Sequence, residues 1–350
     1  QLLGMDGKER ALYSGDVPGE WIAAFDWKTD SSQIVFAASP NTIRVGNLAG
    51  KVLEEAKVTR RETIVAWSGD RQRIVTAGSD ENLRLWTADG KSVDLLNGHM
   101  ARVRSVSWSP FDSRLASLGN DGKLLVWDEA DRSSVEFDGF LIRHDSEGPE
   151  TTSDLVWHPS GKMIAAAGAA STLKIVDLES REVRSWPMLG KILSLAWNPA
   201  GTKLAIGCEP KLLVFWEPGQ IEPRFFSVPD RPRSIEWHDE NNVLIAGQTC
   251  WAVPVDGSKP TEFVKTDGLE TEIRLSPDHQ WFAVAADGVE LFRHDGSSTA
   301  TFANQDSTAV SVAWSPDGTH IAATYNDAAL RIWDIATGKV LWLGLPTHNG

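Results

Sequence analysis

A repeat of about 41 residues runs through the chain and constrains its fold more than any other feature. Short alternating segments end in tryptophan seven times, and one further copy, EIRLSPD, has Leu275 at the same place. The seven anchors are Trp27, Trp67, Trp108, Trp157, Trp197, Trp237 and Trp314. A fixed period of this length indicates a solenoid, a propeller or another array of equal units.

Each unit predicts four short strands. A turn containing Pro, Asp, Gly or Asn follows each anchor, and these residues favour turns for distinct backbone reasons. A strand of small apolar residues such as RLASLG follows, then a β-branched strand such as LLVW and a more polar strand such as KSVDLL. Such frequent turns leave no room for a helix. Eight sheets stacked around an axis can bury both faces of each sheet. We therefore predict an all-β fold, an eight-bladed β-propeller of four-stranded antiparallel blades, with seven blades plus extra strands as the alternative.

The repeats resemble the WD-repeat β-propeller family over about residues 15–345. Residues 98–128, GHMARVRSVSWSPFDSRLASLGNDGKLLVWD, carry the fullest match, and residues 310–334, VSVAWSPDGTHIAATYNDAALRIWD, are similar. The resemblance implies the fold but not a particular function, since propellers host unrelated functions. The compact, Ala-rich style looks like that of bacterial propellers, which are often fused to regulatory modules of signalling or sensor proteins.

The resemblance also places a hydrogen-bond relay of the family in blade 3. It falls on His99, Ser117, Asp121 and Trp127. The aspartate would accept a hydrogen bond from the imidazole, and the indole N–H would find a buried partner. The last blade keeps only Asp327 and Trp333, so we expect the other blades to depend on apolar packing between neighbouring sheets.

We expect residues 1–350 to form one WD-repeat-like propeller domain, because no composition break or helical stretch interrupts the repeats. Residues 1–14 are expected to supply a strand that closes the ring or the tail of a preceding repeat. Residues 338–345, GKVLWLGL, also resemble the fourth strand of a repeat, and only one of the two segments can be the strand that closes the ring. The chain begins with Gln1, so a cleaved leader or a larger parent protein stays open.

Charge and cysteine content argue against several classes of partner. The chain has 34 basic and 48 acidic residues and a net charge of −14, which disfavours generic binding to nucleic acid or anionic membranes. No apolar stretch is long enough for a transmembrane helix. Cys208 and Cys250 are too few for a disulfide framework and fit a reducing cytoplasm. We therefore expect a cytoplasmic protein with no nucleic-acid or membrane partner.

The sequence shows no catalytic, metal or cofactor motif. The eight histidines are scattered singly, whereas metal sites need clustered ligands. Nucleophile-elbow, phosphate-loop and dinucleotide motifs need a strand-to-helix context that is absent here. We predict a non-enzymatic protein without metal or cofactor. The alternative is a propeller enzyme or small-ligand binder with its site in the central channel, and Trp-rich quinone-dependent propellers are one such class.

Two positions per repeat, six and four residues before the anchor, point to the top face around the channel in the family. Six of these 16 positions are basic and none is acidic. Arginine is favoured at interfaces and offers a planar fork for carboxylate or phosphate. Alternatively, these cations pair with turn carboxylates such as Asp80, Asp121 and Asp327. The basic residues and one tryptophan make up the predicted top-face rim: Trp21, Arg61, Arg102, Arg104, Lys191, Arg231 and Arg233.

One insertion adds to this face. The spacing from Trp108 to Trp157 is 49 residues, and the extra length lies near residues 141–151. Long loops on rigid scaffolds often carry recognition, although surface insertions are also tolerated without a function. We predict a scaffold or sensor domain that binds a protein or peptide partner with an acidic motif on its top face. We expect the propeller to be monomeric by itself and part of a larger regulatory protein.

Overall fold

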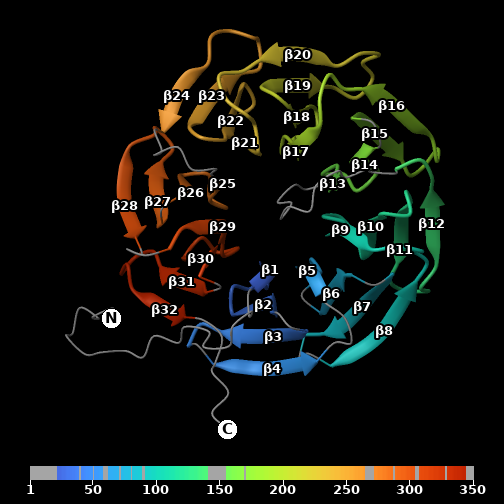
Figure 1. The fold of residues 1–350 in the computed structure, drawn as a ribbon, viewed down its shortest axis with the longest axis vertical. Helices are drawn as coiled ribbons and strands as arrows, with labels where there is room; N and C mark the ends of the chain where they lie inside the picture. The colour runs from blue at the N-terminus through green and yellow to red at the C-terminus, as the bar shows by residue number, and fades with distance from the viewer. Residues whose placement is uncertain are drawn as a thin grey trace.

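The chain forms a ring of eight four-stranded antiparallel sheets around a central axis (Figure 1). This computed structural model describes residues 22–38, 41–49, 51–57, 62–70, 72–79, 81–88, 91–140, 155–168, 171–264, 272–286, 288–303, 307–327 and 329–343. These residues contain no helix. The predicted all-β, eight-bladed propeller is therefore confirmed, and the alternative with seven blades is wrong.

The four strands of each blade pair in chain order, and the first strand of each lies nearest the axis (Figure 1). Blades 1 and 2 contain β1 (Ile22–Trp27), β2 (Gln33–Ala38), β3 (Thr42–Asn47), β4 (Val52–Lys57), β5 (Glu62–Trp67), β6 (Arg73–Gly78), β7 (Asn82–Thr87) and β8 (Ser92–Asn97). Blades 3 and 4 contain β9 (Val103–Trp108), β10 (Arg114–Gly119), β11 (Leu124–Asp128), β12 (Ser134–Phe137), β13 (Leu155–Trp157), β14 (Met163–Gly168), β15 (Thr172–Asp177) and β16 (Val183–Pro187).

The second half of the ring repeats this order. Blades 5 and 6 contain β17 (Ile192–Trp197), β18 (Leu204–Cys208), β19 (Leu212–Trp216), β20 (Arg224–Ser227), β21 (Ser234–Trp237), β22 (Asn242–Ala246), β23 (Cys250–Pro254) and β24 (Thr261–Val264). Blades 7 and 8 contain β25 (Glu272–Leu275), β26 (Trp281–Ala285), β27 (Gly288–Arg293), β28 (Ser298–Ala303), β29 (Ala309–Trp314), β30 (His320–Tyr325), β31 (Leu330–Asp334) and β32 (Val340–Leu343).

The hydrophobic core of the described residues is divided into eight clusters, and each cluster lies between two neighbouring blades. The small apolar second strands supply much of it: every residue of β18, LAIGC, is buried. A four-stranded sheet with two apolar faces needs a neighbour on each side, which a closed ring provides. The repeated sequence pattern therefore requires the ring as a whole.

Five of the seven anchor tryptophans hydrogen-bond their blade to the one before it. The indole N–H of Trp157 donates to the carbonyl of Ser107 at 2.8 Å, and that of Trp314 donates to the carbonyl of Arg274 at 3.0 Å. Trp27, Trp108 and Trp237 make the same bond to the preceding inner strand. Tryptophan suits this place because it fills the gap between sheets and carries one polar group that can be satisfied there.

The ring closes where blade 8 meets blade 1. The fourth strand of blade 8 is β32, from the C-terminal segment that resembles a fourth strand. The indole of Trp27 donates to the carbonyl of Ala313 at 3.3 Å, and Phe36 packs in one cluster with Ile332. Residues 1–14 lie outside the described residues, so their proposed role stays a prediction. No helix in the described part of the chain is long and apolar enough to cross a membrane.

Candidate functional site

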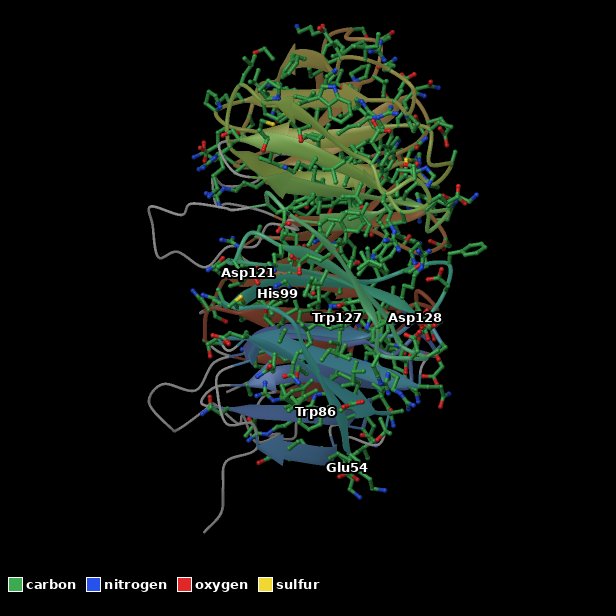
Figure 2. All side chains as sticks on the ribbon, turned by 90° about the vertical axis from the view of Figure 1, so that its right-hand side faces the viewer. Glu54, Trp86, His99, Asp121, Trp127 and Asp128 are labelled. Atoms are coloured by element: carbon green, nitrogen blue, oxygen red, sulfur yellow. The ribbon has the colours of Figure 1, made fainter. Side chains whose placement is uncertain are left out.

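The ring has two faces, which carry different loops. Figure 2 shows His99 and Asp121 at one edge of the ring and Asp128 at the opposite edge. The first edge holds the loop that enters each inner strand and the turn between the second and third strands, and we call it the top face. The five rim positions that the structure describes belong to these entering loops or to the first residues of the inner strands.

The rim residues differ in their exposure. Trp21 and Arg61 lie outside the described residues, as do residues 141–151. The side chains at the other five rim positions split into two groups: Arg102 and Lys191 are exposed, whereas Arg104, Arg231 and Arg233 are half-buried. The rim side chains are therefore not uniformly exposed to solvent.

Blades 5 and 6 bring rim residues together with neighbours that the sequence did not single out. The backbone N–H of Glu209 donates to the carbonyl of Lys191 at 2.8 Å, and the carboxylate of Glu209 pairs with Arg231. The Nζ of Lys211 donates to the carbonyl of Pro229 at 2.9 Å. One rim cation thus has a carboxylate partner, as the alternative interpretation expected, although that partner is Glu209.

In blade 3 the structure brings the four relay side chains into one chain of hydrogen bonds. The indole N–H of Trp127 donates to Ser117 Oγ at 2.8 Å, and that oxygen lies 2.8 Å from His99 Nε2. His99 Nδ1 lies 2.9 Å from Asp121 Oδ2. This network assigns the proton to Nδ1, so Ser117 donates to Nε2 and Asp121 accepts. Figure 2 shows Trp127 between the two edges of the ring, below His99.

The protonation states follow from this burial. Burial lowers the pKa of His99, although the neighbouring Asp121 opposes that shift, so the imidazole is neutral near pH 7. For Asp121, burial raises the pKa, but hydrogen bonds from the N–H of Met100 and from His99 together lower it below its ordinary value. An ionised aspartate therefore bridges the entering loop and the next turn of the same blade.

Blade 8 holds its turn aspartate with a different residue. Arg331 of β31 donates to both carboxylate oxygens of Asp327, and its guanidinium carbon lies 4.2 Å from the ring centre of Tyr325. The side chain of Arg331 is only 5% exposed. Blade 8 therefore adds a buried cation, in place of the imidazole, to the apolar packing that we expected of the blades other than blade 3.

Two carboxylates on inner strands join neighbouring blades. Asp26 of β1 accepts hydrogen bonds from the backbone N–H of Trp67, at 2.7 Å, and of Trp27, at 2.8 Å. Glu272 of β25 accepts the N–H of Val312 at 2.9 Å. Burial raises the pKa of Asp26 to about 7, although the two N–H donors oppose the shift. These acids bind backbone groups of the next blade, which gives each a structural role.

Glu236 of β21 lies in a charged cluster beside blade 7. Its carboxylate is 3.5 Å from Arg274, which also pairs with Glu272 and donates to Ser234 Oγ at 3.0 Å. The Glu236 side chain is 26% exposed, yet the surrounding inner strands desolvate it. This burial raises its pKa to about 7, opposed by Arg274 and aided by Glu272. The cluster therefore has one cation, Arg274, which contacts the carboxylates of both Glu236 and Glu272.

The described residues contain no group of three or more His, Cys, Asp or Glu side chains placed to hold a metal ion. Cys208 and Cys250 are buried and not joined by a disulfide. Burial raises the pKa of the Cys208 thiol to about 12, so this thiol stays protonated and unreactive. The top face carries the exposed cations Arg102, Lys191 and Lys211.

Family comparisons match several blades of the ring. Residues 63–87 and 90–128 match the family described as WD domain, G-beta repeat. Residues 273–344 match the family described as Anaphase-promoting complex subunit 4 WD40 domain. These segments contain parts of blades 2, 3, 7 and 8, so independent parts of the chain support WD40 repeats.

Individual proteins give the same result. WD repeat-containing protein 1 of Rattus norvegicus is 25% identical over 202 residues, which cover 52% of this chain and 33% of the relative. THO complex subunit 3 of Arabidopsis thaliana is 26% identical over 171 residues, covering 49% of this chain and 44% of that protein. The match therefore spans less than half the length of either relative. The C-terminal WD40 domain of Sif2 has a similar fold, with a TM-score of 0.75, 18% identity and coverage of 93% of this chain and 96% of that chain.

The ring thus has the β-propeller fold of the Sif2 WD40 domain, and the matched segments support a relation to WD40-repeat proteins. The curated relatives named above are eukaryotic. They lend no support to the bacterial style that the sequence suggested.

Proposed function

We propose that this propeller is a non-enzymatic scaffold domain that binds an acidic segment of a protein partner on its top face. The carrying observation is that five of the ten described positions six and four residues before an anchor are basic and none is acidic, within a chain of net charge −14. Such a local excess of cations steers an acidic partner and raises its association rate. Two of the five, Arg102 and Lys191, are exposed.

A relative whose name describes an interaction supports the class of function. One relative, from Drosophila melanogaster, is named Actin-interacting protein 1 and is 23% identical over 209 residues, which cover 33% of its length. We further propose that the propeller acts within a larger cytoplasmic regulatory protein and is itself monomeric. The rival function, a ligand site at the axis, has less support because the inner-strand carboxylates already bind backbone groups or Arg274.

A capture experiment with charge-reversed variants tests the proposal. The parent domain and the variant Arg102→Glu/Lys191→Glu are used as bait in lysates, and captured proteins are identified by mass spectrometry. We expect the variant to lose acidic partners, and the parent to lose them as salt rises, since screening weakens exposed charges. The control Lys162→Glu/Arg184→Glu changes two exposed cations away from the rim. Unchanged capture by the rim variant, with the same partners, would exclude the top face.

A further inference from the structure

Two loops on the top face, in blades 5 and 6, place an apolar and a basic residue at repeated positions. Leu189 and Pro229 lie eight residues before the anchors Trp197 and Trp237, and Lys191 and Arg231 lie six residues before them. Both apolar residues are exposed, Leu189 to 73%. An apolar side chain in water adds nothing to the stability of the ring, because its area is not removed from solvent.

Blade 3 repeats the same arrangement. Met100 lies eight residues before Trp108 and is 75% exposed, and the exposed Arg102 follows at six. Blades 3, 5 and 6 are the blades in which the structure describes both positions, and all of them pair an exposed apolar residue with a cation. Repetition at equivalent positions indicates a surface built for one kind of ligand.

Hydrogen bonds and an ion pair join the loops of blades 5 and 6 into one surface. Glu209 connects them, because its N–H donates to the Lys191 carbonyl while its carboxylate pairs with Arg231. Lys211 connects them a second time through the carbonyl of Pro229. We call this surface the blade 5–6 patch, and it consists of Leu189, Lys191, Glu209, Pro210, Lys211, Pro229 and Arg231.

The charges of the blade 5–6 patch favour an anionic ligand. The residues that define the patch include three cations, Lys191, Lys211 and Arg231, and one acid, Glu209, which pairs with Arg231. A carboxylate from a partner could bind the two lysines and compete with Glu209 for the guanidinium. Binding of charge alone would not require Leu189 to stand in water beside these cations, so the ligand should also carry apolar groups.

We propose that the blade 5–6 patch binds an extended acidic peptide segment of a partner protein in which large apolar side chains alternate with carboxylates. This inference rests on the proposed function and adds the apolar half of the recognition. The carboxylates contact Lys191, Lys211 and Arg231, and the apolar side chains pack on Leu189 and the two prolines of the patch. The charges speed association, and the apolar contacts slow dissociation.

Fluorescence anisotropy with three labelled peptides of equal length tests this. In the first peptide glutamates alternate with leucines, in the second with serines, and in the third lysines alternate with leucines. We expect the glutamate–leucine peptide to bind about tenfold more tightly than the glutamate–serine peptide, since it alone buries apolar area. The lysine–leucine peptide should not bind. Leu189→Ser should weaken binding of the glutamate–leucine peptide severalfold and leave that of the glutamate–serine peptide unchanged.

Phe111→Ser is the matched control, because Phe111 is 74% exposed in the turn after Trp108, at the opposite edge from His99. It should leave every affinity unchanged. Equal affinity of the two acidic peptides would overturn the proposed apolar contacts. The proposed function would still stand if Lys191→Glu/Lys211→Glu weakened the binding of both acidic peptides. Equal binding of the lysine–leucine and glutamate–leucine peptides would overturn the proposed preference for carboxylates, and the proposed function with it. Binding of neither acidic peptide would overturn this inference, and the capture experiment would still judge the proposed function separately.

Discussion

In blade 3 a neutral imidazole holds the turn aspartate, and at the same place in blade 8 a guanidinium holds it. Asp121 accepts from His99, which comes from the loop that enters the blade. Asp327 accepts from Arg331, which comes from the third strand of its own blade. Both acids lie 13 residues after their anchor tryptophans, so they are equivalent in the repeat.

The space around the two acids changes with the donor. A Cβ on Gly119 would lie 2.4 Å from His99 Nδ1, so the imidazole of blade 3 fits only over a glycine. Blade 8 has Gln305 in the sequence at the place of His99, and the residue equivalent to Gly119 is Tyr325, whose ring packs under the guanidinium of Arg331. The donor and the residue beneath it therefore change together.

Blade 6 shows a third arrangement, with the acid on the other loop. Asp230 lies in the entering loop and accepts the backbone N–H groups of Gln248 and Thr249 in the next turn. What the three blades share is a carboxylate that bridges the entering loop or third strand to the turn. In these three blades, different residues make a comparable bridge.

The largest expected difference between blades 3 and 8 comes from deleting the acid. Asp327→Ala leaves Arg331 as a buried, unpaired cation, and we expect a loss of about 3 kcal/mol in the free energy of unfolding. Asp121→Ala leaves His99 neutral and mainly removes an acceptor from backbone N–H groups, so its loss should be smaller, about 1–2 kcal/mol. Urea unfolding followed by tryptophan fluorescence measures both.

A double variant separates charge from packing in blade 8. Leu125 stands in blade 3 at the place of Arg331, so Asp327→Ala/Arg331→Leu imitates a pair without charge. We expect it to recover much of the stability lost in Asp327→Ala, because no cation remains buried. A double variant no more stable than Asp327→Ala would show that the unpaired charge is not the cause of the loss.

Gly119→Ala is expected to act next most strongly, by about 2 kcal/mol. The new methyl group would overlap His99 and Asp121 and force the relay apart, which leaves buried polar groups unsatisfied. Gly69→Ala is the control, because nothing lies within 4 Å of the added methyl group. Circular dichroism melts of the two variants should differ clearly, and equal melting temperatures would mean that the relay can shift without cost.

These two blades also show how far sequence reasoning reaches. The anchors predict eight blades because each unit repeats the strand pattern, and blade 3 carries all four relay residue types in sequence order. The pair of Asp327 and Arg331 escapes such reasoning, because an arginine in a strand is ordinarily read as solvent-facing. Likewise, Lys211 and Glu209 join the top face only once the turn of blade 5 folds against the loop of blade 6.

The smallest expected difference is in the dependence on pH. The folded pKa of His99 lies below that of the unfolded chain, about 6.5, so the unfolded state binds more protons as the pH falls below that value. The stability that His99 contributes is therefore lost on acidification from pH 7 to 5. In the blade 8 pair, Asp327, whose pKa is lowered, loses its contribution only below about pH 4.

The measurement is the difference in unfolding free energy between the parent and His99→Gln at pH 7 and at pH 5. We expect this difference to shrink by about 1 kcal/mol on acidification. Asp26 and Glu236, whose pKa values are raised to about 7, stabilise the ring as the pH falls, but they do so equally in both proteins and cancel. For Asp327→Ala/Arg331→Leu, the difference from the parent should stay constant over the same range. Parallel curves for the parent and His99→Gln would contradict a neutral imidazole in blade 3, and with it the contrast between the two blades.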